Sequence, residues 1–417
     1  MATQLKVNLD PVDVPNRPAH VPAELVRDLH WAMGACPVDY AEPYRETERL
    51  FAPDMPRIMW TPDAVPMVES AGAWVVTRYE DIARIYKDAE TFSTNGVANF
   101  QALIGEMWLT IPLSIDPPDH MKYRQMLNPY FSPRATDELE PKMRIAAQEI
   151  IEQFKDRNEV DVAYDFARIF PVRVFLDLMG FPRSMFEQFL EWVNRIIHSR
   201  DFEDMREALK SVIAYLREFK DEQKANPNGE LGGYIATSTV DGRPITDDEI
   251  LGIYFMLWLG GLDTVASTVS QAFRRLAMDP EMQERIRSTP ELITDAVEEL
   301  LRVQPLVNSP RLVAKDTEFH GVQMKQGDWV ICLNTAGNFD PEEFECPREV
   351  RLDREPNRHF TLAGGAHRCL GSHFARREVL VALDEWLQRM PPFRMKPGSD
   401  LTVYPGLQST RHVHITW

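Results

Sequence analysis

A glycine-rich stretch at positions 362–371, LAGGAHRCLG, holds a cysteine beside a histidine and an arginine. Cysteine acts as a metal ligand through its thiolate, which nearby cations and N–H donors stabilise. His367 and Arg368 supply such donors, while Gly365 and Gly371 allow backbone N–H groups and a flat ligand to come close. The stretch therefore suits a cradle for a metal-bound sulfur and an anion. A structural thiol buried in a turn is the other interpretation of Cys369, and the loop alone leaves both open.

A second candidate for chemistry lies in the apolar segment MLWLGGLDTVAST at 256–268. Gly260 and Gly261 each cost about 1 kcal/mol relative to alanine inside a helix. Asp263 is a carboxylate that is expensive to bury without a partner, and Thr264 can bend a helix by bonding back to a carbonyl. Close helix packing explains the glycines alone. The combination predicts a small polar chamber for a diatomic ligand and water, with a proton source beside it.

The elements that position these residues are expected to be mainly helical, with a small β region. Capping boxes at 77–80 and 246–249 predict helices through about Asp88 and Met278, the second about 48 Å long. The turn at 116–118 predicts another helix start. Apolar spacing predicts helices over 137–156, 183–199, 203–224, 290–304 and 373–390. Alternating or β-branched runs predict strands at 74–77, within 311–333 and at 413–416.

The amino-acid composition argues against several classes of partner and site. The net charge of −18 argues against nucleic acid and against anionic membranes as partners. The four cysteines are scattered without metal-site spacing, which disfavours a zinc site or a disulfide scaffold. The N-terminus has no hydrophobic signal segment, and residues 1–25 read as an extended arm. A single domain over 1–417, monomeric and cytoplasmic, is expected.

Four motifs in order give the chain a resemblance to the cytochrome P-450 family of haem-thiolate monooxygenases, over essentially its whole length. They are GGLDT at 260–264, ELLR at 299–302, NFDPEEFECPREVRLDR at 338–354, and GGAHRCLG with the following HFARRE. The resemblance implies the helical, haem-binding fold of that family, with haem b (iron protoporphyrin IX) as cofactor. It makes Cys369 the axial iron ligand, because thiolate ligation favours O–O cleavage.

Other residues take roles from the same resemblance. His120, Arg124, Arg311 and His367 would hold the haem propionates, and Gly365 and Gly371 would border the cofactor. Asp263 would relay protons and Thr264 would hold bound oxygen and a water. Glu299 and Arg302 would form a buried structural pair, although a surface pair at this spacing is worth only about 0.2–0.5 kcal/mol.

The resemblance is closest to the bacterial camphor 5-monooxygenase group, with several departures. Leu362 stands where the family usually has phenylalanine. Trp108 replaces a tyrosine that binds the substrate ketone. Asn194 and His198 occupy positions where an acid and an arginine are expected, so proton delivery should differ in detail.

The implied activity is hydroxylation of a small hydrophobic substrate, a terpenoid or norisoprenoid ketone, with O2 and electrons from a ferredoxin. A haem-thiolate sensor without turnover, or a peroxide-using enzyme of the same fold, would not need the Asp263–Thr264 pair. The expected pocket is mainly apolar with a few weak donors. Its residues are Trp108, Thr110, Leu113, Met256, Leu259, Gly260, Leu306, Val307, Ser309, Val403 and Tyr404.

The expected electron donor is an acidic iron–sulfur ferredoxin with its NADH-dependent reductase. A local excess of basic residues around Cys369 on an acidic protein could steer such a partner to the haem. The basic residues are Lys122, Arg124, Arg358, Arg368, Arg376 and Arg377.

Overall fold

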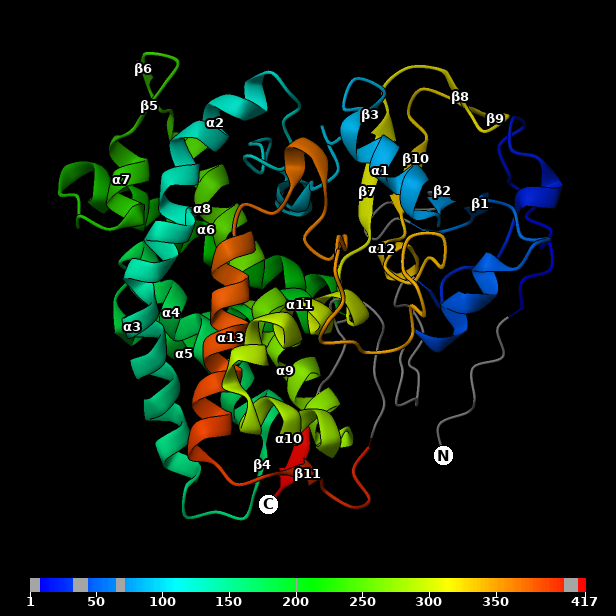
Figure 1. Cartoon of the computed structure of the whole chain (residues 1–417). Coiled ribbons are helices and arrows are strands. Elements are labelled where there is room, and N and C mark those ends of the chain that lie inside the picture. The colour runs from blue at the N-terminus through cyan, green and yellow to red at the C-terminus, as the bar shows by residue number, and fades with distance from the viewer. Residues whose placement is uncertain (1–7, 33–43, 65–71, 200, 401–411) are drawn as a thin grey trace. The chain divides into compact units, whose positions relative to one another are not determined.

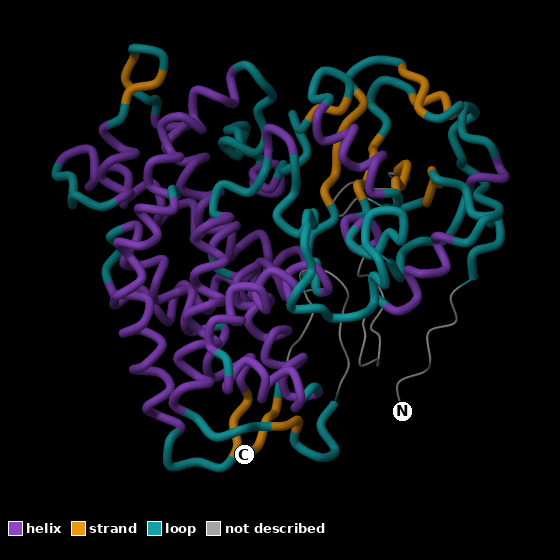
Figure 2. The backbone as a smooth tube through the Cα atoms, viewed as in Figure 1, coloured by secondary structure: helices purple, strands orange, loops and turns teal. Residues whose placement is uncertain are grey.

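A computed structural model of the chain describes residues 8–32, 44–64, 72–199, 201–400 and 412–417. The residues form two compact units, each assembled from segments far apart in the sequence. Unit 1 contains residues 1–97, 295–369 and 400–410, and unit 2 contains 98–294, 370–399 and 411–417. Helices predominate and strands form small groups (Figures 1 and 2), which confirms the predicted mainly α protein with a small β region.

Unit 1 is built around a mixed sheet of strand order β1-β2-β10-β7-β3. β10 runs parallel to β2 and antiparallel to β7, so residues distant in sequence become neighbours in the sheet. Trp74, Val330 and Tyr86 are among the side chains that form the core beside it. The elements of unit 1 are β1 (Ile58–Thr61), β2 (Ala73–Val76), α1 (Tyr79–Lys87), β3 (Phe92–Ser93), α11 (Ile293–Val303, from Asp295), β7 (Ser309–Val313), β8 (Thr317–Phe319), β9 (Val322–Met324), β10 (Trp329–Cys332) and α12 (Asn334–Gly337), with short 3-10 turns η1 (Ala23–Leu25), η2 (Arg45–Phe51) and η10 (Gly365–His367).

The start of α1 corrects one prediction. Thr77 does not cap the helix; its hydroxyl contacts the Arg57 carbonyl at 3.4 Å, and the helix begins at Tyr79. The Tyr79 N–H donates instead to the Asp340 carboxylate at 2.7 Å. An acceptor from a distant part of the chain therefore takes the place of the local capping box.

Unit 2 is mostly helical, with aromatic side chains filling its core. Phe166 stands edge-on to both Phe273 and Trp386, with ring centroids 5.7 and 5.5 Å apart. Its helices are α2 (Asp119–Leu127), α3 (Pro133–Ile151), α4 (Ile169–Met179), α5 (Phe186–Val193), α6 (Phe202–Ala225), α7 (Leu231–Thr237), α8 (Asp247–Gly261), α9 (Asp263–Met278), α10 (Pro280–Ser288) and α13 (Ser372–Arg389). Its strands are β4 (Glu159–Asp161), β5 (Thr239–Val240), β6 (Arg243–Pro244), β11 (Arg394–Met395) and β12 (His414–Thr416), and its short turns are η3 (Phe100–Ile104), η4 (Asn128–Phe131), η5 (Glu152–Phe154), η6 (Ala163–Ala167), η7 (Arg183–Met185), η8 (Asn194–His198) and η9 (Pro290–Leu292).

The central helix begins as predicted but is not continuous. The capping box at its start is present: Glu249 N–H donates to the Thr246 hydroxyl at 3.3 Å, and Thr246 N–H donates to the Glu249 carboxylate at 2.7 Å. Leu262, at φ −101° and ψ −70°, separates α8 from α9. The 32-residue stretch Asp247–Met278 is long and apolar enough to cross a membrane, but most of it is buried inside the protein, as expected for a core helix.

Several boundaries differ from the predicted ones. Asp116 provides a backbone acceptor for His120 N–H at 3.0 Å rather than a side-chain cap, and α2 begins at Asp119. The helix expected over 183–199 divides into η7, α5 and η8. The helix expected from about 290 begins at Ile293 and ends at Val303, ahead of Pro305.

Candidate functional site

The cysteine loop belongs to unit 1, where backbone contacts fix its shape. Cys369 N–H donates to the Leu362 carbonyl at 2.9 Å, which closes the loop around η10. Gly365 adopts φ +64°, and a Cβ there would lie 1.8 Å from the Tyr86 carbonyl oxygen. Only glycine therefore permits this close approach to α1. Cys369 is half-buried rather than enclosed in the core.

Two cationic side chains of unit 1 were predicted to hold an anion. Arg311 is 5% exposed on β7 and lies over the Tyr86 ring at 5.0 Å, with one N–H donated to the Pro310 carbonyl at 2.7 Å. Among the described residues no carboxylate pairs with Arg311. Because a buried charge is costly without a counter-ion, this guanidinium suits an anionic ligand. His367 contacts the Thr94 hydroxyl at 3.1 Å.

Unit 2 contributes the other predicted pair, on α2. His120 and Arg124 are four residues apart and share a helix face. His120 is fully buried, and burial together with the Arg124 charge lowers its pKa to about 4. At neutral pH its imidazole is therefore an uncharged hydrogen-bonding group. Lys122 points elsewhere, because its ammonium pairs with Asp119 at 2.8 Å and Asp241 at 2.7 Å.

The structure contains the hydrogen bond by which Thr264 was expected to distort the central helix. Its hydroxyl donates to the Gly260 carbonyl at 2.7 Å, so that carbonyl is satisfied where the helix is interrupted. Asp263 begins α9 and is only 6% exposed. A Cβ on Gly261 would lie 3.3 Å from the Phe175 ring, so close packing is also part of the reason for glycine here.

One stripe of α8 and the start of α9 is less buried than its surroundings. Met256, Leu259, Gly260 and Thr264 are half-buried, whereas most other residues in the middle of α8 and α9 are fully buried. Their spacing of three or four residues is that of one helix face. The stripe is apolar as far as Gly260 and ends at the hydroxyl of Thr264.

Two polar residues expected in the pocket, Trp108 and Thr110, donate their hydrogen bonds within the protein. Trp108 donates its indole N–H to Glu106 at 2.5 Å, and Glu106 also pairs with Arg217 at 2.7 Å. The Thr110 hydroxyl donates to the Ala98 carbonyl at 2.8 Å. In this structure Trp108 therefore has no N–H left for a substrate carbonyl.

The remaining pocket predictions are distributed over both units. Leu113 is half-buried in unit 2, whereas Leu306, Val307 and Ser309 belong to unit 1. Ser309 lies beside Asn334, whose amide contacts its hydroxyl at 3.5 Å. Val403, Tyr404 and the side chain of His198 lie outside the described residues.

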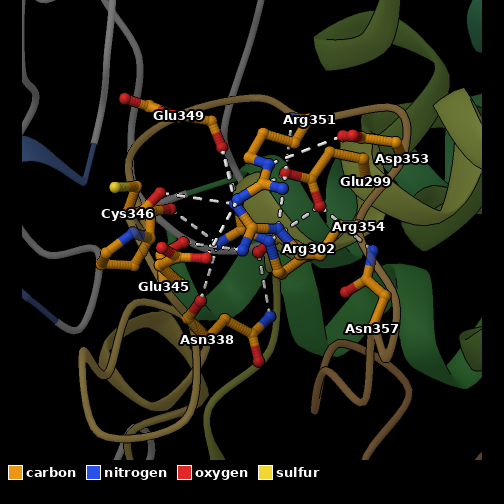
Figure 3. Close-up of polar contacts among 11 residues, drawn as sticks. Glu299, Arg302, Asn338, Glu345, Cys346, Glu349, Arg351, Asp353, Arg354 and Asn357 are labelled. Carbon is orange, nitrogen blue, oxygen red and sulfur yellow. Dashed lines mark hydrogen bonds and ion pairs between the residues drawn. The ribbon is translucent and has the colours of Figure 1, made fainter.

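The segment that precedes the cysteine loop is held by Glu299 and Arg302, both fully buried (Figure 3). Arg302 makes a two-bond ion pair with Glu299 at 2.7 and 2.8 Å. Its guanidinium also donates to the carbonyls of Asn338, Pro347 and Glu349 at 2.7–3.1 Å. The pair thus joins α11 to the chain between 338 and 357.

Three groups were missed by sequence reasoning, the half-buried Glu106 and the buried Tyr86 and Glu378. Glu106 holds Trp108, and Tyr86 supports both Arg311 and the Asn334 amide, to which its hydroxyl donates at 2.8 Å. Glu378 on α13 is buried with no hydrogen-bond partner among the described residues, and burial raises its pKa well above the usual value. No local signal marks these residues, because the sequence does not show which carboxylates are buried.

Each unit supplies groups that suit a haem. Unit 1 has the half-buried Cys369 for iron and, for a propionate, the buried Arg311, which pairs with no carboxylate among the described residues. Unit 2 has the buried His120 for a propionate, and its acid–alcohol pair Asp263–Thr264 lies at the end of the half-buried apolar stripe.

Comparisons with known proteins agree with this fit. The family model described as "Cytochrome P450" matches residues 170–403. A Sinorhizobium fredii protein named "Probable cytochrome P450 127A1" is 35% identical over 96% of each chain. The structure of CYP101J2 covers 97% of this chain and all of its own at 30% identity and a TM-score of 0.84. The structure of CYP101C1 covers 96% of this chain and 99% of its own at 32% identity and a TM-score of 0.83.

Proposed function

Because the chain belongs to the cytochrome P450 family of monooxygenases, we propose that it hydroxylates a small terpenoid or norisoprenoid ketone with O2 and electrons from a ferredoxin. The ketone class rests on the resemblance to the camphor-type group. The observation that supports a hydrophobic substrate is the half-buried apolar stripe of Met256, Leu259 and Gly260, which ends at Thr264. Because Trp108 and Thr110 use their donors within the protein, recognition rests on shape more than on hydrogen bonds.

The side chains divide the work of holding haem b and moving protons. When bound, thiolate-ligated haem supplies the oxidising chemistry, in which one oxygen atom enters a C–H bond and the other leaves as water. Cys369 holds the iron, while Arg311, His367, His120 and Arg124 hold the propionates. Asp263 relays protons. The Thr264 hydroxyl donates to the Gly260 carbonyl, so its oxygen lone pairs are available to accept a hydrogen bond from water.

The test is a screen of hydrophobic ketones for a substrate-induced change in iron spin state, followed by O2 uptake and product analysis with a ferredoxin system. A ketone that shifts the spin state and yields one hydroxylated product per O2 supports the proposal. If ketones bind but no O2 is consumed, the protein is a binding protein rather than a monooxygenase. If no ketone binds, the substrate class is wrong.

Replacing Thr264 by alanine should uncouple the reaction. We expect electron consumption to continue while hydrogen peroxide replaces most of the hydroxylated product, because water and protons are no longer positioned. Asp263→Asn should instead slow turnover by about a hundredfold or more, the usual loss when a proton-transfer group is removed. NADH consumption, peroxide and product measured together distinguish the two effects.

Thr264→Ser is the matched control, because it keeps the hydroxyl that contacts Gly260. It should retain most of the coupling. Normal coupling in Thr264→Ala would contradict the assigned role.

The proposed redox partner is an acidic ferredoxin with its NADH-dependent reductase. We propose that the protein itself is cytoplasmic and acts as a single domain. Three of the predicted basic residues are ion-paired in the structure, including Arg358 with Glu343 at 3.1 Å and Arg377 with Asp137 at 2.7 Å. These pairs reduce the local positive field, so we expect steering of moderate strength.

Reduction by the ferredoxin should therefore slow severalfold as ionic strength rises from low to physiological values, because salt screens the attraction between the two proteins. Stopped-flow reduction at a series of salt concentrations measures this. The ketone-induced spin shift is the control and should not change over the same series. A reduction rate that is independent of salt would remove the steering argument.

A further inference from the structure

The small sheet β11-β12-β4 of unit 2 brings a second group of possible metal ligands together (Figure 1, near the C-terminus). β12 pairs antiparallel with β4, and His414 is directly opposite Asp161. Because side chains alternate across a strand, His412 lies on the same side as His414. Two imidazoles and a carboxylate thus share one face of the sheet.

The possible ligand atoms lie close together, although their separations differ from those around a bound ion. His412 Nδ1 lies 2.5 Å from Asp161 Oδ2, and the rings of His412 and His414 are nearly parallel with centroids 5.5 Å apart. One ligand atom from each of the three residues lies within 4.8 Å of the others. Donors around a tetrahedral zinc ion are about 3.4 Å apart. Small side-chain rotations would bring the three ligand atoms to this separation, and the exposed His412 side chain is free to rotate in this way.

The backbone holds this arrangement in place. Val413 N–H donates to Asp161 Oδ1 at 2.9 Å, and Val162 N–H donates to the Val413 carbonyl at 2.9 Å. The second carboxylate oxygen of Asp161 therefore points to His412 while the first fixes the strand. Nearby, Lys396 pairs with Glu159 at 2.7 Å, and the ion-pair partner of Asp161 among the described residues is His412.

An ordinary histidine–carboxylate pair would need no second imidazole. The chain offers such a pair for comparison, since His30 Nδ1 lies 2.7 Å from Asp28 Oδ1. What distinguishes the C-terminal group is the additional His414 opposite Asp161. Imidazole nitrogen favours zinc and related transition metals over magnesium or calcium, which prefer oxygen ligands.

We propose that Asp161, His412 and His414 bind a divalent transition metal ion, with Zn2+ as the expected ion, and that this ion fastens the C-terminal strand to β4. The three residues leave one coordination position for water. The role is structural and does not depend on the proposed monooxygenase activity.

Isothermal titration of the haem-loaded, EDTA-treated protein with zinc sulfate tests the site. We expect one saturable site, weakened at least about tenfold in His412→Gln or His414→Gln, and no comparable site for Mg2+. Asp161→Asn should also weaken binding while keeping an acceptor for Val413 N–H, so the strand pairing survives. His30→Gln is the matched control and should bind zinc as the wild type does.

Hydrogen exchange with and without zinc tests the fastening. Zinc should slow exchange of the amides in 412–417 and raise the melting temperature of the wild type, but not of His414→Gln. The site is refuted if the wild type shows no saturable binding, or if the His412 and His414 variants bind as tightly as His30→Gln. Zinc binding without protection of 412–417 refutes the fastening.

Discussion

Replacing Cys369 by serine should abolish the strongly red-shifted Soret band that we expect of the wild-type protein after reduction and addition of carbon monoxide, and should reduce hydroxylation to background. The reason is electronic, because a thiolate ligand donates electron density to iron that a serine hydroxyl cannot supply. The change removes one sulfur from a partly exposed loop position and leaves the Cys369 backbone bond to Leu362 intact. The loss should therefore be spectral and catalytic without global unfolding.

Cys346→Ser is the matched control for this experiment. Cys346 is a second free cysteine, exposed in unit 1, so its replacement should leave the spectrum unchanged. Haem content and circular dichroism of both variants distinguish loss of the ligand from loss of the fold. An unchanged spectrum in Cys369→Ser would contradict the assignment of Cys369 as the iron ligand, and with it the monooxygenase proposal.

Local patterns predicted the helices well where the stabilising contacts are also local. The capping box at 246–249 joins residues three apart, and the structure contains both of its hydrogen bonds. The similar pattern at 77–80 failed because Asp340, 261 positions away, caps Tyr79 instead. A distant acceptor of this kind leaves no trace in the sequence near the helix start.

In the central helix too, local contacts were predicted and distant ones were not. Glycine, aspartate and threonine in an apolar segment predicted a local distortion, and the Thr264 hydroxyl does bond to the Gly260 carbonyl. The sequence could not show that the distortion separates two helices at Leu262. Nor could it show that a Cβ on Gly261 would lie 3.3 Å from the Phe175 ring of α4, which is a tertiary contact.

Family motifs predicted one part of the candidate site, whereas residues whose role depends on burial were missed. The cysteine loop and the Glu299–Arg302 pair were predicted from the family resemblance, and the structure contains the buried ion pair. The occupied indole N–H of Trp108 depends on Glu106, and the significance of Arg311 depends on the absence of a carboxylate beside it among the described residues. Both are properties of tertiary packing.

Replacing Arg302 by alanine should prevent the protein from accumulating as a folded haem protein. The change breaks a fully buried ion pair, which costs about 3–5 kcal/mol, and leaves three carbonyls without their donor at about 1–3 kcal/mol each. In the variant, the Glu299 carboxylate still accepts hydrogen bonds from Arg354 at 3.1 Å and from Asn357 at 3.0 Å, so its charge loses only part of its stabilisation. Even so, the expected loss is comparable to the whole stability of a typical domain, about 5–15 kcal/mol.

Urea unfolding and haem content of the purified protein measure this effect, with Arg351→Ala as the matched control. Arg351 lies in the same segment, but its side chain pairs with the exposed Asp353 at 3.5 Å, and exposed pairs are worth about 0–1 kcal/mol. Its backbone N–H, which donates to Glu299 at 2.9 Å, is kept in the variant. Arg302→Lys should be intermediate, because an ammonium keeps the charge but cannot reach Glu299 and three carbonyls at once. Similar stabilities for Arg302→Ala and Arg351→Ala would show that the buried pair does not hold the segment before the cysteine loop.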